Sequence, residues 1–213
     1  YRYPADAGGE GFVLGPVDLT VVPGELLFLI GGNGSGKTTL IKLLAGLYSP
    51  TKGTVRNNGV KLESDSLEAY RGLFTVLFAD GFLFPTLLGL DDPDLDARAA
   101  RLIDELGLRG HVRVEQGTFS TTTLSQGQRK RMALLAACLE DRPILVLDEW
   151  ASYQDPAFKR AFYREILPAL RARGKTLVVI SHDEEFFDVA DRVVHLTGGA
   201  LDSEAATDPT PRA

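Results

Sequence analysis

The 213-residue sequence contains a single cysteine, Cys138, so no intramolecular disulfide can form. Cys138 lies in an apolar helical stretch, where a packed thiol is the expected role, and this usage fits a reducing compartment. No apolar run approaches the ~20 residues needed to span a bilayer, and no signal peptide is visible. The formal net charge of −6 argues against a protein whose main task is to grip nucleic acid.

Apolar segments of strand length alternate with segments of helical periodicity, and no internal repeat is present. This alternation predicts an α/β fold with a mostly parallel sheet, in which ligands bind at the carboxyl ends of the strands. The length indicates one domain with a sizeable core. Strands are expected at residues 12–22, 26–30, 73–78, 144–147, 176–180 and 192–196, and helices at residues 40–47, 65–70, 95–106, 125–140, 156–173 and 183–190.

Turn residues mark the connections between these elements. Pro23-Gly24 predicts a turn, and Asn58-Gly59 predicts a β-hairpin. The sequence begins at Tyr1 rather than at methionine, and we expect it to be a piece of a longer protein. Loops are expected at residues 81–92 and 115–123, and a flexible tail at residues 198–213.

The first motif with a chemical meaning follows the strand at 26–30 and opens a helix, which is the context of a phosphate-binding loop. Its glycines let backbone N–H groups point at a phosphate, and the helix adds unpaired donors and the positive end of its dipole. Lys37 can reach the outer phosphates, and the Thr38 hydroxyl can bind magnesium. A glycine-rich turn that matches by chance is the alternative, which the flanking strand and helix disfavour. The candidate phosphate-binding residues are Gly31, Gly32, Asn33, Gly34, Ser35, Gly36, Lys37, Thr38 and Thr39.

A pair of acids, Asp148 and Glu149, follows the apolar strand at 144–147. Next to a phosphate-binding loop, the first carboxylate belongs near magnesium, and the second can orient or deprotonate an attacking water. Two solvated acids at the end of a strand are the alternative. The presence of Lys37 and Thr38 in the same chain favours the catalytic interpretation.

A third motif, Leu-Ser-Gln-Gly-Gln at residues 124–128, stands at the head of a predicted helix. Ser125 and Gln128 are three residues apart and predict a capping box. A capped helix start with a serine and a glycine also suits a phosphate, so capping and binding are compatible. The basic residues that follow could contact an anionic partner or form a solvated face; they are Arg129, Lys130 and Arg131.

Taken in chain order, at residues 31–39, 124–128 and 144–149, the three motifs resemble those of the nucleotide-binding domain of an ABC transporter, and the resemblance covers residues 1–197. Residues 31–38 resemble its Walker A motif, and residues 144–149 resemble its Walker B motif with the adjacent catalytic glutamate. Residues 124–128 resemble its signature, LSGGQ. The ordered set is far more specific than any one motif.

The resemblance implies ATP and Mg²⁺ as ligands. It also implies an antiparallel β lobe on the N-terminal side and a helical lobe, at about residues 80–135, that carries the signature. Asp155 matches the D-loop aspartate, His182 matches the switch histidine, and Tyr3 matches the aromatic residue that stacks on adenine. The implied catalytic residues are Lys37, Glu149 and His182, and the implied metal ligands are Thr38 and Asp148. The residues implied to act in trans, on the site of a second copy in a head-to-tail ATP-dependent dimer, are Ser125, Gly127, Gln128 and Asp155.

Further segments resemble the exporter subfamily for cyclic peptides and siderophore peptides. Members of that subfamily are half-transporters with a membrane domain N-terminal to the ATPase. The resemblance therefore implies a membrane domain upstream of Tyr1, a position at the cytoplasmic face of the bacterial inner membrane, and no nucleic-acid partner. The segments are residues 124–131, 139–143, 148–150, 154–156 and 162–168.

Two functions from other classes remain as alternatives. A soluble ABC-type ATPase that acts on ribosomes or DNA usually resembles a tandem pair or carries coiled-coil insertions, and neither feature is visible in this sequence. A regulatory nucleotide-binding module would not turn over ATP. The presence of Glu149 and His182 argues against it.

The sequence departs from the family pattern at two places. Gln126 replaces the first glycine of the signature and adds bulk beside the expected γ-phosphate contact. No glutamine follows the strand at 73–78, where the family has one that senses magnesium and the membrane domain. Asp80 is the candidate replacement and metal ligand, with Ala79 as the other alignment. The lobe at 80–123 is also short for the family, which places its docking surface in question.

Overall fold

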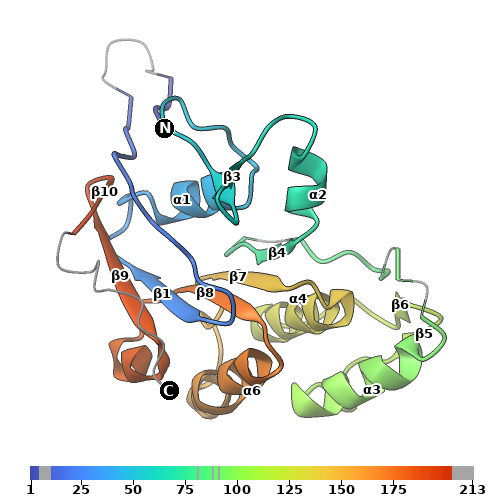
Figure 1. The fold of residues 1–213 in the computed structure, drawn as a ribbon. Coiled ribbons are helices and arrows are strands. Elements are labelled where there is room, and N and C mark those ends of the chain that lie inside the picture. Colours follow the sequence, from blue (N-terminus) through green and yellow to red (C-terminus); the bar gives the residue numbers. More distant parts are fainter. Residues whose placement is uncertain (5–10, 81, 88, 91, 203–213) are drawn as a thin grey trace.

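Six strands form one central sheet in the computed structural model, which describes residues 1–4, 11–80, 82–87, 89–90 and 92–202. Five strands run parallel, and the short last strand pairs antiparallel with its neighbour (Figure 1). The predicted α/β fold with a mostly parallel sheet is confirmed. The order across the sheet is β10 (Ala200–Leu201), β9 (Arg192–Thr197), β1 (Leu26–Ile30), β8 (Thr176–Ile180), β7 (Ile144–Asp148) and β4 (Phe74–Leu77).

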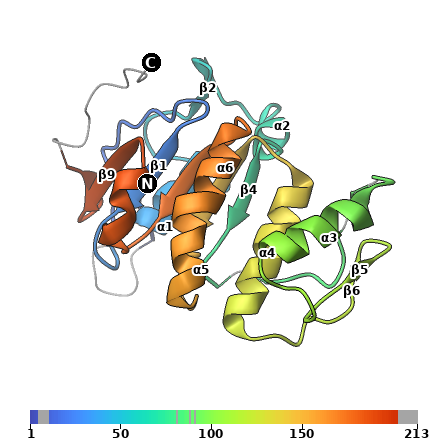
Figure 2. The same cartoon turned by 90° about the horizontal axis from the view of Figure 1, so that it is seen from below.

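Helices cover both faces of the sheet, because successive side chains of a strand point to opposite sides. In β1, Leu26 and Phe28 pack into one core, whereas Leu27 and Leu29 pack into the other. The first core lies against α4 and the rod formed by α5 and α6, and the second lies against α1 (Figure 2). The helices are α1 (Lys37–Leu44), α2 (Leu67–Arg71), α3 (Leu95–Glu105), α4 (Gln126–Glu140), α5 (Pro156–Ala161) and α6 (Leu167–Ala172).

Two smaller lobes flank this core. The strands β2 (Arg56–Asn57) and β3 (Val60–Lys61) form the predicted hairpin, and both residues of its Asn58-Gly59 turn have positive φ. On the other side, α3 packs against α4 and lies beside β5 (Val114–Glu115) and β6 (Thr118–Phe119) (Figure 1). The antiparallel lobe and the helical lobe implied by the family resemblance are both present.

The predicted strand at residues 12–22 is wrong. Only Val13 pairs there, in a single antiparallel bridge with Arg2. Gly15 has a φ of +118°, which turns the chain, and Pro16 has no N–H to offer to a ladder. The predicted turn at Pro23-Gly24 is present.

Two short elements also differ from the prediction. The polar stretch at 115–123 is not all loop, because β5 and β6 form a hairpin around Gln116-Gly117, both at positive φ. The segment Glu184–Val189 forms a 3₁₀-helix (η2) rather than an α-helix. Asp94 directly precedes α3, but its side chain makes no capping hydrogen bond.

The predicted helix at residues 156–173 is present but is interrupted by a π-helical turn, η1 (Phe162–Ile166), between α5 and α6. Pro168 accounts for the interruption, because its ring nitrogen cannot donate to the carbonyl four residues earlier. The Leu167 N–H instead donates to the Phe162 carbonyl, five residues earlier.

The central sheet includes residues closer to the C-terminus than predicted. Residues 198–202 of the predicted tail form a turn and β10, and residues 203–213 lie outside the described residues.

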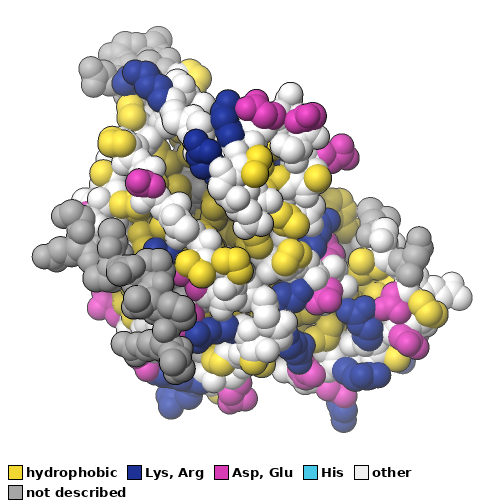
Figure 3. Space-filling view, in the orientation of Figure 1, with side chains coloured by type: hydrophobic (Ala, Val, Ile, Leu, Met, Phe, Trp, Pro, Cys, Tyr) yellow, Lys and Arg dark blue, Asp and Glu magenta, His cyan; other side chains and the backbone are white. Residues whose placement is uncertain are grey.

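In the described part of the chain, no helix combines the length and apolar character needed to cross a membrane. Burial raises the pKa of Cys138 to about 11, as expected for a packed thiol. On the face seen in Figure 3, basic and acidic side chains are interspersed over the lower half.

Candidate functional site

The phosphate-binding loop lies between the end of β1 at Ile30 and the start of α1 at Lys37. Three of its glycines, Gly31, Gly34 and Gly36, have positive φ, which glycine adopts without steric cost. Gly31 has a φ of +143°, and a Cβ there would collide with the Leu196 carbonyl of β9. Gly36 has a φ of +106°, a conformation that L-residues rarely adopt. The loop therefore wraps closely against the sheet edge where β1 and β9 end.

The loop offers the donors that a polyphosphate needs. Among the described residues, no side chain caps the N-terminus of α1, so the amides of its first turn and the positive end of its dipole remain available. Lys37 is buried, and its Nζ donates to the carbonyls of Gly31 and Gly32 at 2.7 and 3.0 Å. The ammonium is therefore held inside the curve of the loop. This donor set fits the phosphates of ATP.

The two side chains predicted to bind magnesium, Thr38 and Asp148, meet beside the loop. The Thr38 hydroxyl donates to Asp148 Oδ2 at 2.9 Å, which joins the start of α1 to the end of β7. Burial raises the pKa of Asp148 above its ordinary value, and the carboxylates of Glu149 and Asp80 add to the rise. The Thr38 hydrogen bond and the Lys37 ammonium oppose it. Ionised Asp148 thus lies in surroundings that favour a cation next to it.

The Glu149 and His182 side chains come together although 33 residues separate them, and His182 Nε2 lies 3.2 Å from Glu149 Oε1. β7 and β8 are adjacent and parallel, so the residues that follow them meet at the same sheet edge. The backbone of Glu149 has a φ of +48°, unusual for a residue with a side chain. Its N–H donates to the Ile180 carbonyl at 3.2 Å, and its own carbonyl accepts from Lys130 Nζ at 2.8 Å. The hydrogen bonds of its N–H and its carbonyl therefore both hold Glu149 in this left-handed conformation.

The head of α4 forms the predicted capping box. Ser125 Oγ accepts from the Gln128 N–H at 3.3 Å, and Gln128 Oε1 accepts from the Ser125 N–H at 3.1 Å. Gly127 approaches the neighbouring loop so closely that a Cβ would lie 2.8 Å from the Tyr153 carbonyl oxygen. Gln126 is exposed, so its side chain is tolerated within its own chain.

Two of the three basic residues after residues 124–128 make specific contacts rather than form a solvated face, and the sequence did not predict their roles. Lys130 holds Glu149, as described above. Arg131 donates to Gln154 Oε1 at 2.8 Å and to Asp155 Oδ2 at 2.6 Å, and its guanidinium lies 3.5 Å from the centre of the Phe158 ring. Only Arg129 of the three is exposed.

Asp155 caps α5 within its own chain, and its Oδ1 accepts from the Phe158 N–H at 2.9 Å. That hydrogen bond, together with the Arg131 guanidinium, holds the pKa of Asp155 below its ordinary value. The Gln154 amide also donates to the Gly127 carbonyl at 3.1 Å. The signature helix and the segment after Glu149 therefore form one connected unit.

Tyr3 lies close to the phosphate-binding loop. Its hydroxyl is 3.1 Å from Thr39 Oγ1, and its ring packs edge-on against Tyr1 and Tyr48. The long-range placement of Tyr3 beside α1 agrees with an adenine platform next to the phosphates. Stacking on adenine stays a prediction.

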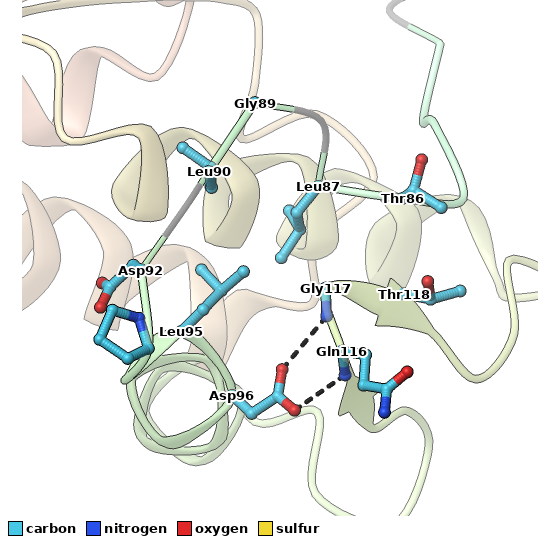
Figure 4. A pocket seen from close by; sticks show the side chains of 11 residues that line it. Thr86, Leu87, Gly89, Leu90, Asp92, Leu95, Asp96, Gln116, Gly117 and Thr118 are labelled. Carbon is cyan, nitrogen blue, oxygen red and sulfur yellow. Dashed lines mark hydrogen bonds between the residues drawn. The ribbon is translucent and has the colours of Figure 1, made fainter.

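A hollow of about 700 Å³ lies on the helical lobe, lined by residues around the start of α3 and the β5–β6 turn (Figure 4). Asp96 joins α3 to the β5–β6 turn within this lining, because its carboxylate accepts from the Gln116 N–H at 2.8 Å and the Gly117 N–H at 3.2 Å. The lining includes no predicted site residue.

Comparisons with known proteins identify the family of this chain. A family profile described as "ABC transporter" matches residues 14–152. The ATP-binding protein SyrD of Pseudomonas syringae pv. syringae is 48% identical over 207 residues, which cover 95% of this chain and 36% of that protein. The ATP-dependent lipid A-core flippase of Alkalilimnicola ehrlichii is 36% identical over 218 residues, covering 94% and 35%. The chain spans about a third of the length of these curated relatives.

Among solved structures, a dimeric ATP-binding cassette in a post-hydrolysis state bound to ADP and Pi aligns with a TM-score of 0.77. The alignment covers 94% of this chain and 93% of that chain at 23% sequence identity, so it bears on the fold alone. The family profile and the identity to SyrD show more. This chain belongs to the ABC transporter family, as one of its ATPase cassettes.

Proposed function

We propose that this chain is the ATP-hydrolysing domain of an ABC exporter and that ATP-dependent closure of a head-to-tail dimer drives transport. The observation that carries the proposal is the meeting of two side-chain pairs beside the phosphate-binding loop. Thr38 and Asp148 are 2.9 Å apart, and Glu149 and His182 are 3.2 Å apart. In our proposal, the first pair binds the metal ion. The second pair supplies a general base, Glu149, together with the histidine that contacts it.

Each residue then has one task. Lys37 and the backbone N–H groups of residues 31–39 bind the phosphates, and Tyr3 stacks on adenine. Glu149 accepts a proton from the water that attacks the γ-phosphate, and His182 contacts both Glu149 and that phosphate. The Lys130 hydrogen bond keeps Glu149 in its unusual backbone conformation.

Magnesium fits this donor set. Thr38 and Asp148 would hold it, since Mg²⁺ bound to nucleotides takes one or two protein oxygens and the phosphates supply others. Within the described ranges, no group of three or more His, Cys, Asp or Glu side chains is arranged to bind a metal by itself. When bound, the ion neutralises charge that develops on the phosphates. Asp80, whose charge acts on Asp148, is a further candidate contact.

Phosphate release from ATP, measured across a magnesium titration of the 213-residue chain, tests this function. We expect turnover that requires both ATP and magnesium. A chain that bound ATP but released no phosphate at saturating magnesium would contradict the proposal and would favour a regulatory nucleotide-binding module.

In the same titration, Asp80→Asn should raise the magnesium concentration for half-maximal turnover by about fivefold, because one exposed charge near the ion is worth ~1 kcal/mol. Asp65→Asn is the matched control, since Asp65 is exposed and is not among the charges that act on Asp148. Asp80→Gln restores the usual family residue and should support turnover. An unchanged midpoint in Asp80→Asn would remove Asp80 from the metal site.

The dimer is proposed because the signature motif faces outward from its own chain. Ser125 and Gln126 are exposed at the N-terminus of α4, where a phosphate of a second copy would meet the helix. Ser125, Gly127 and Gln128 would close the partner's ATP site. The link from Gly127 through Gln154 to Asp155 would report that closure to the segment after Glu149.

The cargo is proposed to be a cyclic peptide or a peptide siderophore, on the strength of the subfamily resemblance in residues 124–131 and 162–168. The curated relatives are about three times as long as this chain, which leaves room for a membrane domain, fused on the N-terminal side in our proposal. The cassette would then work at the cytoplasmic face of the bacterial inner membrane. No observation favours the alternative of a soluble ATPase unconnected with transport.

A further inference from the structure

Tyr163 is a buried tyrosine whose hydroxyl lies between the two neighbours of His182. Its side chain is 1% exposed, and its oxygen is 2.7 Å from Ser181 Oγ and 2.9 Å from Asp183 Oδ2. Burial raises the pKa of Tyr163 far above its ordinary value, so the hydroxyl keeps its proton. The proton is donated to Asp183, which leaves the tyrosine oxygen to accept from the Ser181 hydroxyl.

Two more hydrogen bonds hold the same turn. Ser181 Oγ accepts from the Asp183 N–H at 3.0 Å, and Lys159 Nζ donates to Asp183 Oδ1 at 2.7 Å. His182 lies between these two anchored residues, with its side chain about half exposed. The backbone at His182 is therefore restrained on both sides, while its imidazole remains free to meet Glu149 and a ligand.

The π-helical turn η1 places Tyr163 at this position. A π turn contains one residue more than an α turn and shifts the side chains on either side of it, and such turns are frequent at functional sites. Phe162 and Tyr163 are both buried, and the Tyr163 ring stacks on Phe186 with centroids 4.4 Å apart. Phe186 belongs to η2, which begins two residues after His182. The tyrosine thus packs on one side of the His182 turn and hydrogen-bonds to the turn itself.

We propose that Tyr163 is a positioning residue for ATP hydrolysis, which holds the turn at residues 181–183 so that His182 meets Glu149 and the γ-phosphate. The inference rests on the proposed function, because it takes His182 to act in catalysis. A purely structural hydroxyl would contribute to stability alone. A positioning hydroxyl also affects turnover, and leaves ATP affinity unchanged.

Tyr163→Phe removes the hydroxyl and keeps the ring, so the core stays filled. We expect kcat for phosphate release to fall at least about tenfold, since a displacement of ~1 Å in a catalytic group costs up to ~10²-fold. KM for ATP should stay within about twofold of the parent, because Tyr163 does not line the phosphate-binding loop. Steady-state ATPase assays of the 213-residue chain measure both quantities.

Tyr70→Phe is the matched control. Tyr70 is also buried, and its hydroxyl donates to the Leu44 carbonyl at 2.7 Å, away from the His182 turn. Both variants should lower the thermal unfolding midpoint, but Tyr70→Phe should keep kcat within about twofold of the parent. A parental kcat in Tyr163→Phe, or an equal loss in Tyr70→Phe, would overturn the proposal.

A double variant separates this inference from the proposed function. In the His182→Ala background, Tyr163→Phe should cause no further loss of kcat, because the residue that it positions is gone. A further tenfold loss there would show that Tyr163 acts by another route. If His182→Ala alone kept the parental kcat, the assignment of His182 itself would fail, whatever Tyr163 does.

Discussion

A Glu149→Gln chain is expected to bind ATP as the parent does but to hydrolyse it at least about a hundredfold more slowly, since general-base catalysis contributes ~10²–10⁴-fold. The change keeps the size of the side chain and loses the basic carboxylate. Glu149 contacts His182 and lies one residue beyond Asp148, so in the proposed site it would face the reacting end of the nucleotide without belonging to the phosphate-binding loop. An assay of phosphate release measures the rate of hydrolysis, and calorimetry measures the affinity for ATP.

Blocked hydrolysis should also change the oligomeric state. In the proposed cycle, hydrolysis dissolves the ATP-dependent contact in the parent, so the closed dimer should accumulate in Glu149→Gln when ATP is present and disappear in ADP. Adding Ser125→Arg should prevent that dimer, because it places bulk and charge in the partner's site. Gel filtration with light scattering measures the mass in each nucleotide.

Glu184→Gln is the matched control for these experiments, because Glu184 is an exposed carboxylate two residues after His182. It should turn over ATP at the parental rate and form no stable dimer. A Glu149→Gln chain that stayed monomeric in millimolar ATP would count against the trans role of Ser125. One that hydrolysed ATP at the parental rate would remove Glu149 from the mechanism.

Lys37→Ala should weaken ATP binding at least about tenfold, because each charge-assisted hydrogen bond to a phosphate is worth ~1.5–3 kcal/mol. Lys37 is held by the carbonyls of Gly31 and Gly32, so its ammonium is already placed within the loop before a phosphate binds. Calorimetric titration with ATP measures the loss. Affinity equal to that of the parent would contradict the assignment of the loop.

Two further variants show whether the effect comes from charge or from a collapsed loop. Lys37→Met keeps the apolar stem and should lose affinity as Lys37→Ala does. Lys52→Ala removes an exposed lysine and should bind ATP as the parent does. Full affinity in Lys37→Met with reduced affinity in Lys37→Ala would mean that the stem, rather than the ammonium, matters.

The parts of the site that were predictable are those built from consecutive residues. The loop at 31–39 depends on glycines, a preceding strand and a following helix, all adjacent in the chain. The capping box needs only Ser125 and Gln128, three residues apart, and it formed as predicted. The predicted strand at 12–22 does not form, for an equally local reason, because Gly15 turns the chain at positive φ and Pro16 has no backbone N–H.

The sequence by itself determined the order of the motifs, the α/β class, and which residue types stand at the ends of the strands, because short-range geometry and periodicity decide these. Only the tertiary structure decided which of those ends meet. Thr38 meets Asp148 across 110 residues, and His182 meets Glu149 across 33 residues. Tyr163 reaches the His182 turn from a π-helical turn that periodicity did not predict. The order of the parallel strands and the packing of the helices over them depend on burying apolar side chains on both faces of the sheet. The periodicity of the sequence shows which residues are buried, but it does not show which of them contact each other.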